Sequence, residues 1–281
     1  MIRALFLDLD GTLLTSAKKI SPLTRRALAA CKENGIQLYI ATARSPLLER
    51  MLPWERETLS LFDGGLYYNG GCVVLGGRKT YLPIAAEVVR ESIEQVCRYE
   101  ALNIALQLEG EKHAFRFPLE EKGYRSWGVP AGEALALGQA ADARAVKLLV
   151  FYANLVDSVT PVDRGAAQAL ESLCLGRARF YLTDRGRCVQ IMAREANKLS
   201  GVETMRRALG LAEQEIAVFG DDVNDAEMLR AYEHSVAMGN AESHVKSKAR
   251  YVTLDNDSDG IHHALCGILR LVGNCGEGST P

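Results

Sequence analysis

The sequence predicts an α/β protein in which a doubly wound parallel sheet is interrupted by an inserted α+β domain. Three observations predict this architecture. An apolar run at residues 4–9 is typical of a strand buried on both faces of a parallel sheet. A strand–helix–strand unit follows it, and the same alternation returns from residue 199 onward. Between them, short strands with hairpin-like turns replace that pattern.

The strand–helix–strand unit has clear boundaries. Ser21-Pro22 predicts a helix start, because serine caps the first turn and proline fits the first helical position. The helix ends at Asn34-Gly35, and residues 36–40 form the next predicted strand. Further helices of this domain are predicted at 46–58, 199–209, 225–231, 242–249 and after 260, and further strands at 66–68, 216–219, 235–238 and 251–254.

The inserted segment is expected to form an antiparallel sheet with helices on one face. A Gly76-Gly77 turn between two short strands predicts the hairpin that precedes it. Helices are predicted at 85–102 and 162–174, and strands at 104–108, 113–117, 146–152, 179–182 and 188–192. The simplest assembly is a Rossmann-like core domain of residues 1–81 and 191–271, an inserted domain of residues 82–190, and a flexible tail at 272–281.

Composition excludes several functional classes. The 281 residues include 33 Lys and Arg and 35 Asp and Glu, and this balance argues against nucleic-acid binding through a broad basic face. No apolar run reaches the roughly 18 residues of a membrane span. The seven cysteines contain no C-x-x-C pair, which argues against a zinc site or a disulfide framework. We therefore expect a cytoplasmic monomer or homodimer with small-molecule partners, without nucleic-acid or membrane partners.

The motif Asp8-Leu9-Asp10-Gly11-Thr12 follows the first predicted strand. In an extended chain, residues two apart face the same side, so both carboxylates can address one site. A divalent cation is the usual compensation for their repulsion, and Asp8 then has the properties of a nucleophile and metal ligand, while Asp10 can transfer protons. Gly11 lets the backbone approach an anion closely. The alternative is an ordinary Asp-Gly turn, which explains the full motif poorly.

A second acidic motif, Gly220-Asp221-Asp222-Val223-Asn224-Asp225, follows another buried apolar strand. Three carboxylates in five residues are costly there unless a cation balances them. The spacing is not that of an EF-hand loop. An acidic helix start, favoured by the helix dipole, accounts for Asp225 but not for the whole group.

Two further residues carry weaker signals. Thr42 stands at a strand-to-helix junction, where a hydroxyl can donate to a phosphate oxygen or simply cap the helix. Lys198 opens a predicted helix, where an ammonium could neutralise phosphoryl oxygens. Most single lysines are solvated surface groups, so neither residue is decisive alone.

The order of these four motifs resembles the haloacid dehalogenase superfamily, in particular its Cof-like phosphatase branch. D-x-D-G-T, a threonine, a lysine and G-D-x-x-N-D follow one another as in that family. The resemblance extends to Tyr68-Asn69-Gly70 and to the segments at 236–241 and 259–261. It implies an α/β core whose third strand is followed by a large cap domain over the active site.

The resemblance also implies catalytic and metal-binding roles. Asp8 would attack phosphorus and become an aspartyl-phosphate. Asp10 would protonate the leaving oxygen and then activate water, and its backbone carbonyl would bind Mg²⁺ together with Asp8 and Asp221. Asp222 and Asp225 would lie beside these ligands. Asp222 stands where the family commonly has asparagine, which adds a negative charge near the metal.

The phosphoryl group would be bound by a separate set of residues. Thr42, Lys198 and Asn224 would hold its oxygens, next to the backbone of Gly11. Ala43 stands where the family usually has glycine, so the backbone there is less free to adopt positive φ.

The predicted function is a Mg²⁺-dependent phosphatase of small phosphorylated metabolites. Sugar phosphates are the first expectation; nucleotides, pyridoxal phosphate and phosphorylated acids also fit. A phosphomutase of the phosphomannomutase type is the nearest alternative, but the arginines of the inserted segment show no clustering that would grip a phosphorylated sugar at both ends. A non-catalytic sensor of phosphometabolites is disfavoured because Asp8, Asp10 and Asp221 are all present.

Overall fold

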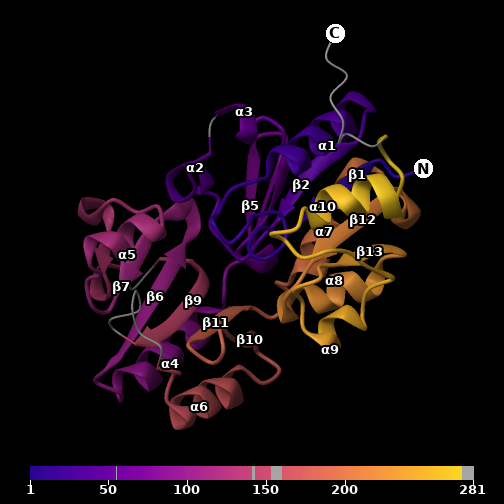
Figure 1. The fold of residues 1–281 in the computed structure, drawn as a ribbon. Helices are drawn as coiled ribbons and strands as arrows, with labels where there is room; N and C mark the ends of the chain where they lie inside the picture. The colour runs from indigo at the N-terminus through magenta and orange to yellow at the C-terminus, as the bar shows by residue number, and fades with distance from the viewer. Residues whose placement is uncertain (55, 141–142, 153–159, 274–281) are drawn as a thin grey trace. The chain divides into compact units, whose positions relative to one another are not determined.

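The computed structural model describes residues 1–54, 56–140, 143–152 and 160–273. The tail predicted at 272–281 therefore lies outside the described residues from residue 274 onward. The chain divides into two compact units (Figure 1). The core unit comprises Met1–Ala43, Leu52–Lys79 and the chain from Lys198 on, and the inserted unit comprises Arg44–Met51 and Thr80–Asn197.

The core unit is built on an eight-stranded sheet with the order β14-β13-β12-β1-β2-β3-β4-β5. The pairs from β14 through β3 are parallel, and β4 is antiparallel to β3. From the central β1, the chain first extends the sheet in one direction and later, from β12, in the other. The strands are β1 (Ala4–Leu7), β2 (Gln37–Ala41), β3 (Gly64–Tyr67), β4 (Cys72–Leu75), β5 (Arg78–Tyr81), β12 (Ile216–Gly220), β13 (His234–Ala237) and β14 (Tyr251–Val252).

Helices cover both faces of this sheet, which explains why its central strands are apolar throughout. All four residues of β1 are buried. Phe6 and Tyr39 stack and belong to a core cluster with residues of α7 and α8, while α1 packs against β2 and α10. The helices are α1 (Pro22–Glu33), α3 (Arg56–Leu59), α7 (Lys198–Leu209), α8 (Ala226–Ala231), α9 (Ser243–Lys246) and α10 (Gly260–His263), with a π-turn at Ala264–Ile268.

The start of α1 agrees with its sequence signals. The Ser21 side chain accepts a hydrogen bond from the Thr24 N–H, Pro22 occupies the first helical position, and Asn34 follows the last turn. The single helix predicted at 46–58 is wrong. Two short helices, α2 (Leu48–Met51) and α3, replace it. Pro53 explains the break, because proline lacks the N–H donor and disfavours helical geometry in the preceding residue.

The inserted unit contains a six-stranded sheet with the order β10-β11-β9-β6-β7-β8. Its pairs are antiparallel except for β7 with β8. The strands are β6 (Leu102–Leu108), β7 (His113–Phe115), β8 (Leu135–Ala136), β9 (Ala145–Tyr152), β10 (Ala178–Thr183) and β11 (Cys188–Ala193). The predicted fold class, a parallel α/β core with an inserted α+β unit, is confirmed.

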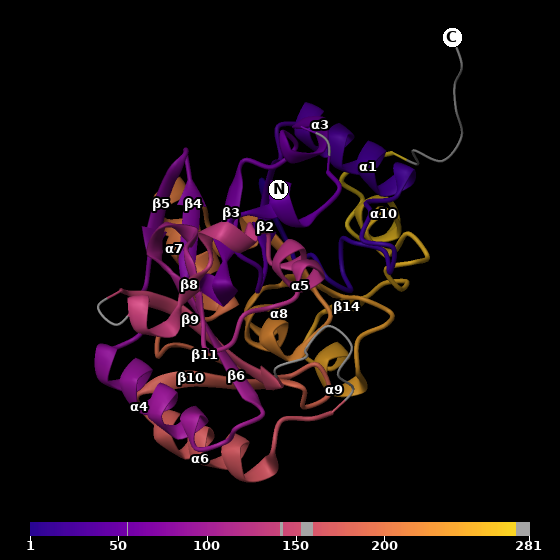
Figure 2. The same cartoon turned by 90° about the vertical axis from the view of Figure 1, so that its left-hand side faces the viewer.

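Two helices cover one face of the inserted sheet. Helices α4 (Ala86–Cys97) and α6 (Arg164–Cys174) pack against each other and bury the apolar side chains of that face (Figure 2). On the opposite face, a smaller cluster forms around Phe115 and Phe151. Tyr124, from the short helix α5 (Glu121–Ser126), joins this cluster. Neither α5 nor β8 is among the elements predicted from the sequence.

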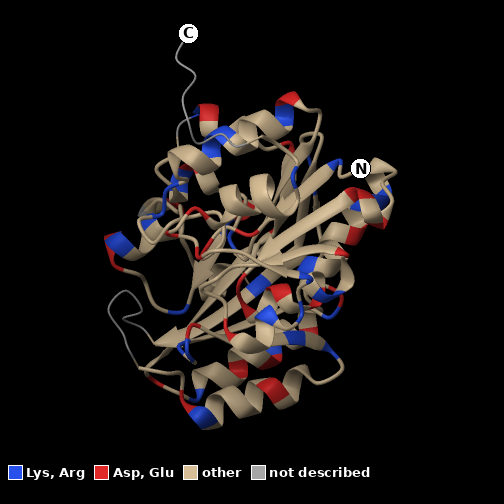
Figure 3. Ribbon diagram, turned by 45° about the vertical axis from the view of Figure 1, so that its right-hand side comes forward, with Lys and Arg blue, Asp and Glu red and all other residues tan. Residues whose placement is uncertain are grey.

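Basic and acidic residues both occur on the surface helices (Figure 3), in line with the balanced composition. Among the described residues, no helix combines the length and the apolar character that crossing a membrane requires.

His113 is a buried titratable group in the inserted unit. Its Nδ1 lies 3.0 Å from the carbonyl oxygen of Glu111, and its Nε2 lies 3.1 Å from the Gln107 amide nitrogen. Because a carbonyl can only accept, Nδ1 carries the proton and Nε2 accepts from Gln107. Burial, opposed in part by the hydrogen bond to Glu111, lowers the pKa of His113 to about 4. The folded protein therefore keeps this imidazole neutral.

We expect the free energy of unfolding to decrease more steeply on acidification in the native protein than in a His113→Gln variant. The unfolded chain binds a proton at His113 below about pH 6.5, whereas the folded chain resists it until about pH 4. Acidification from about pH 8 to pH 5 should thus cost about 2 kcal/mol through this group alone. Urea unfolding at both pH values measures the effect, and His244→Gln, at an exposed histidine, is the control. Equal pH slopes for native protein and His113→Gln would contradict it.

Candidate active site

The candidate site lies where the strand order of the core sheet reverses. Ligands of open α/β sheets bind beyond the carboxyl ends of the strands at such a point. Strands β1 and β12 are parallel neighbours, with Leu7 opposite Phe219. The Asp8 N–H continues this pairing with a 3.1 Å hydrogen bond to the Phe219 carbonyl. Asp8 and Asp221, which directly follow these strands, are therefore placed side by side.

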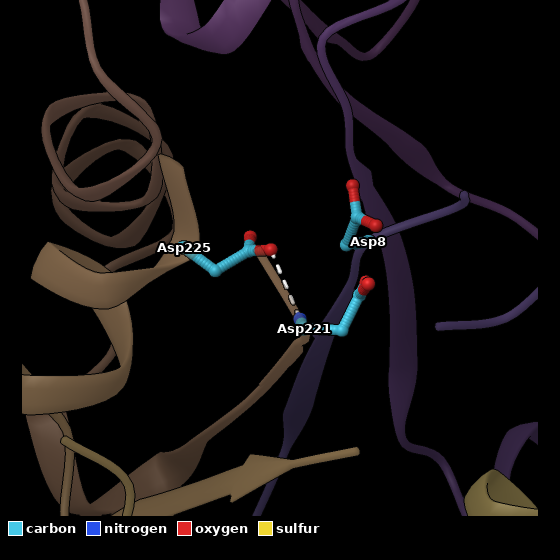
Figure 4. A group of neighbouring side chains, drawn as sticks. All are labelled: Asp8, Asp221 and Asp225. Carbon is cyan, nitrogen blue, oxygen red and sulfur yellow. Dashed lines mark hydrogen bonds between the residues drawn. The ribbon is translucent and has the colours of Figure 1, made fainter. Parts of the chain in front are cut away.

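Three carboxylates meet at this point. One side-chain oxygen from each of Asp8, Asp221 and Asp225 lies within 4.8 Å of the others (Figure 4). Asp8 and Asp225 are buried, at 6% and 0% exposure, and Asp221 is partly buried. The two acidic motifs, more than 200 residues apart in the chain, thus converge as their positions after neighbouring strands predicted.

Lys198 supplies the ammonium of this group. It is the first residue of α7 and is 1% exposed. Its Nζ donates to Asp8 Oδ1 and to Asp225 Oδ1, each at 2.6 Å. Both hydrogen bonds are short and charge-assisted, and the lysine and its two carboxylate partners are buried. They are therefore strong interactions whose loss would leave buried charges unpaired.

The pKa values show that the negative charge is incompletely compensated. Burial raises the pKa of Asp8 well above its usual value, and Asp225 and Asp221 raise it further against the opposing effect of Lys198. Burial, followed by Asp225, likewise raises the pKa of Asp221 to about 7. Burial alone would lower the pKa of the Lys198 ammonium, but Asp225 and Asp8 raise it above its usual value. The lysine therefore stays charged, but its single positive charge does not neutralise the negative charges of the three carboxylates.

The Asp221 carboxylate is oriented by neutral groups. Thr12 Oγ1 donates to Asp221 Oδ1 at 2.6 Å. Asn240 Nδ2 donates to the Gly11 carbonyl at 2.8 Å and lies 3.4 Å from Asp221 Oδ2. Gly11 has a φ of +83°, and a Cβ there would lie 2.2 Å from Asp221 Oδ2. Glycine at position 11 is thus required by the close approach of the Asp221 carboxylate.

Asp225 anchors the loop after β12. Its Oδ2 accepts hydrogen bonds from the N–H groups of Asp221 and Asp222, both at 3.1 Å, while its Oδ1 is bound to Lys198. Asp222 is exposed, and its own carboxylate accepts from the Val223 N–H. Asp225 therefore fixes Asp221, and the Asp222 carboxylate is outside the group of three.

Asp10 lies beside this group rather than within it. Its carboxylate accepts a 2.7 Å hydrogen bond from Lys18 Nζ, and the two side chains are 39% and 50% exposed. A solvent-accessible carboxylate can exchange protons, as the sequence-based assignment to acid–base chemistry requires. Such an exposed ion pair is weak, about 0–1 kcal/mol.

Two of the residues predicted to hold the phosphoryl group are buried beyond the strands that flank β1 on its two sides. Thr42 follows β2 and is 1% exposed, and Asn224 follows β12 and is 8% exposed. Asn224 Nδ2 donates to Asn69 Oδ1 at 2.9 Å, and the Asn69 N–H donates to the Thr42 carbonyl at 3.0 Å. Asn69 therefore links the two predicted phosphate-binding residues.

Sequence reasoning gave no role to Thr12, Asn69 or Asn240. Thr12 is the last residue of the D-x-D-G-T motif, and the two asparagines stand in motifs that were recognised without a function. Their hydrogen bonds join segments more than 150 residues apart.

The residues present fit a divalent cation. Three carboxylates and one ammonium leave two negative charges when all are ionised. Carboxylate oxygens are the ligands that hard cations such as Mg²⁺ prefer. Asp225 uses both oxygens for Lys198 and the backbone, which leaves Asp8 and Asp221 as the carboxylates available to such an ion.

We expect Lys198→Gln to destabilise the protein by about 3–5 kcal/mol in the absence of divalent cations, because two buried carboxylates lose their partner. Urea unfolding in a chelator measures this loss. Lys32→Gln, which breaks the partly exposed pair with Asp63, is the control and should cost less than about 1 kcal/mol. Similar losses of unfolding free energy in both variants would show that the buried ion pairs of Lys198 stabilise the fold no more than a partly exposed pair does.

Comparison with solved structures identifies the fold. The sugar phosphatase BT4131, of haloacid dehalogenase subclass IIB, superimposes with a TM-score of 0.78 at 23% identity, covering 96% of this chain and 100% of that one. At this level of identity the likeness concerns the fold.

Sequence relatives differ in length. Phosphatase YwpJ of Bacillus subtilis is 25% identical over 299 residues, covering 95% of this chain and all of the relative. A chloroplastic endoribonuclease, YBEY of Arabidopsis thaliana, is 27% identical over 271 residues, and the match spans 93% of this chain but only 45% of that protein.

The family model for haloacid dehalogenase-like hydrolases matches residues 5–265, and thus both units and every candidate site residue. The predicted resemblance and the predicted enzyme class, a phosphatase-type hydrolase, are confirmed. The chain belongs to the haloacid dehalogenase-like hydrolases.

Proposed function

We propose that this hydrolase is a Mg²⁺-dependent phosphatase that acts on small phosphorylated metabolites through an aspartyl-phosphate. One observation carries the proposal: the carboxylates of Asp8, Asp221 and Asp225 meet beside the buried ammonium of Lys198, which leaves two negative charges uncompensated when all four groups are ionised. A divalent cation would neutralise that charge, and an attacking carboxylate would then face a phosphoryl group.

The side chains of Asp8 and Asp221 and the backbone carbonyl of Asp10 would hold Mg²⁺. Bound there, the ion would neutralise charge on the phosphoryl oxygens. Thr12 and Asn240 orient the Asp221 carboxylate for this purpose. Asp225 contributes indirectly, because it holds the N–H groups at Asp221 and Asp222.

The protein's own groups would carry out two displacements. In the first, a carboxylate oxygen of Asp8 bonds to phosphorus, the bond from phosphorus to the leaving oxygen breaks, and Asp10 gives that oxygen a proton. In the second, Asp10 takes a proton from water, the water oxygen bonds to phosphorus, and the Asp8–phosphorus bond breaks to release phosphate. Lys198, Thr42 and Asn224 would bind the phosphoryl oxygens.

The substrate would be chosen by the inserted unit, acting as a cap. The side chains of the inserted sheet support this role. Its face opposite α4 and α6 bears buried polar residues such as Gln107, Lys147 and Gln190 among apolar ones. Sugar phosphates are the first class to test, followed by nucleotides, pyridoxal phosphate and phosphorylated acids. The predicted cytoplasmic location and the monomeric or homodimeric state stay predictions.

Replacing the nucleophile should abolish turnover. We expect Asp8→Ala to hydrolyse a generic aryl phosphate with Mg²⁺ at least about 1,000-fold more slowly than the native enzyme, because the carboxylate that would form the covalent intermediate is removed. Release of the aryl alcohol measures the rate. Glu33→Ala, at an exposed residue of α1, is the control with unchanged activity. Turnover at the native rate in Asp8→Ala would refute the nucleophile assignment.

Removal of divalent cations should abolish the same activity. We expect EDTA to inactivate the enzyme and excess Mg²⁺ to restore it. Asp221→Asn should need about tenfold more Mg²⁺ for half-maximal rate, because the site loses one charged ligand. Mg²⁺ titrations of the native enzyme and of this variant give the two midpoints. Full activity in EDTA would exclude the metal requirement.

A further inference from the structure

The turn after β3 has a strained backbone. Tyr68, Asn69 and Gly70 have successive positive φ angles of 52°, 54° and 91°. Asparagine tolerates the left-handed region better than most residues, whereas a bulky residue such as Tyr68 adopts it only where its surroundings enforce it. Such backbone strain recurs at functional sites, where neighbouring structure holds it in place.

The surroundings that hold this turn carry candidate catalytic residues. The Asn69 N–H donates to the Thr42 carbonyl, and the Thr42 N–H donates to the Leu66 carbonyl, both at 3.0 Å. On another side, Gly201 of α7 packs so closely that a Cβ there would lie 3.3 Å from the Gly70 Cα. The turn therefore contacts both the segment with Thr42 and the helix that begins at Lys198.

The Asn69 side chain reaches a third part of the site. Its Oδ1 accepts the 2.9 Å hydrogen bond from Asn224 Nδ2, and both amides are buried. The other amide atom of Asn224, Oδ1, is buried and has no hydrogen-bond partner among the described residues. The orientation of the Asn224 amide is thus set by Asn69.

We propose that Asn69 is a positioning residue for phosphoryl binding. Its side-chain carbonyl fixes the amide of Asn224, and its backbone fixes the strand end at Thr42. The inference rests on the proposed function, because it assumes that Asn224 and Thr42 bind the phosphoryl group. The hydrogen bonds of Asn69 described here go to Thr42 and Asn224, so we expect its loss to weaken phosphoryl binding rather than metal binding.

Two substitutions separate positioning from a purely structural role. Asn69→Gly keeps the freedom to adopt positive φ and removes only the amide, whereas Asn69→Ala removes both. If Asn69 served the turn alone, Asn69→Gly would behave like the native enzyme. If it positions Asn224, Asn69→Gly will fold normally and still bind phosphate poorly.

The readouts are KM for an aryl phosphate, the inhibition constant of inorganic phosphate, the Mg²⁺ midpoint and Tm. We expect Asn69→Gly to raise KM and the phosphate inhibition constant about tenfold, the scale of one lost hydrogen bond to a charged group, with an unchanged Mg²⁺ midpoint. Asn69→Ala should show the same loss and a lower Tm. Asn34→Gly, at the exposed residue that ends α1, is the control.

A double-mutant cycle with Asn224→Ala tests the route of the effect. Because Asn69 acts through Asn224, the double variant should bind phosphate no worse than Asn224→Ala alone. Additive losses, or a native inhibition constant in Asn69→Gly, would overturn the positioning role while leaving the phosphatase proposal intact. If the native protein neither hydrolyses aryl phosphates nor binds phosphate, the proposed function fails and this inference fails with it.

Discussion

The buried ammonium of Lys198 is the interaction on which the rest of the site depends. It lies between the carboxylates of Asp8, which directly follows β1, and Asp225, which lies in the turn between β12 and α8. Without a cation, burying these carboxylates would be prohibitively costly, and they would take up protons or move apart. Asp225 in turn accepts a hydrogen bond from the Asp221 N–H. Lys198, by fixing Asp225, therefore also fixes the loop that carries Asp221.

One ammonium does not complete the charge balance, and this shortfall gives the site its chemistry. Lys198 binds only Asp8 and Asp225. The raised pKa values of Asp8 and Asp221 reflect, first, their burial and, second, the repulsion that remains among the carboxylates. A stable core would have used a second cation from the chain. The residues present instead fit a divalent ion supplied from solution, and in the proposed function that ion would share its charge with a phosphoryl group.

The parts of the site that could be predicted from sequence are those fixed by strand ends. Asp8 and Asp221 follow buried apolar runs, so parallel pairing alone brings them together. The pairing of Lys198 with Asp225 could not be predicted in this way, because spacing does not say which carboxylate an ammonium will meet. The same holds for Thr12 and Asn240, whose partners depend on how loops fold back over the strand ends.

The fold shows a similar division. Helix α1 was predictable because its signals, Ser21, Pro22 and Asn34, are local. The break at Pro53 was also signalled locally, because a proline inside a predicted helix interrupts it, but a single helix was nonetheless predicted over residues 46–58. Helix α5 and strand β8 lie in a segment without periodicity, and they are held by contacts with an existing sheet, such as that of Tyr124 with Phe115.

The placement of β1 against β12 has a consequence for how the chain folds. Ala4 pairs with Ile216, 212 positions further along, so the centre of the main sheet closes only after the whole inserted unit has been synthesised. Closing so long a loop is entropically expensive and slow unless the intervening chain is already compact. The inserted unit, with its own sheet and apolar cluster, can fold first and shorten that loop. Until then the edge of β1 that will pair with β12 has no partner, and an unpaired apolar strand edge favours aggregation.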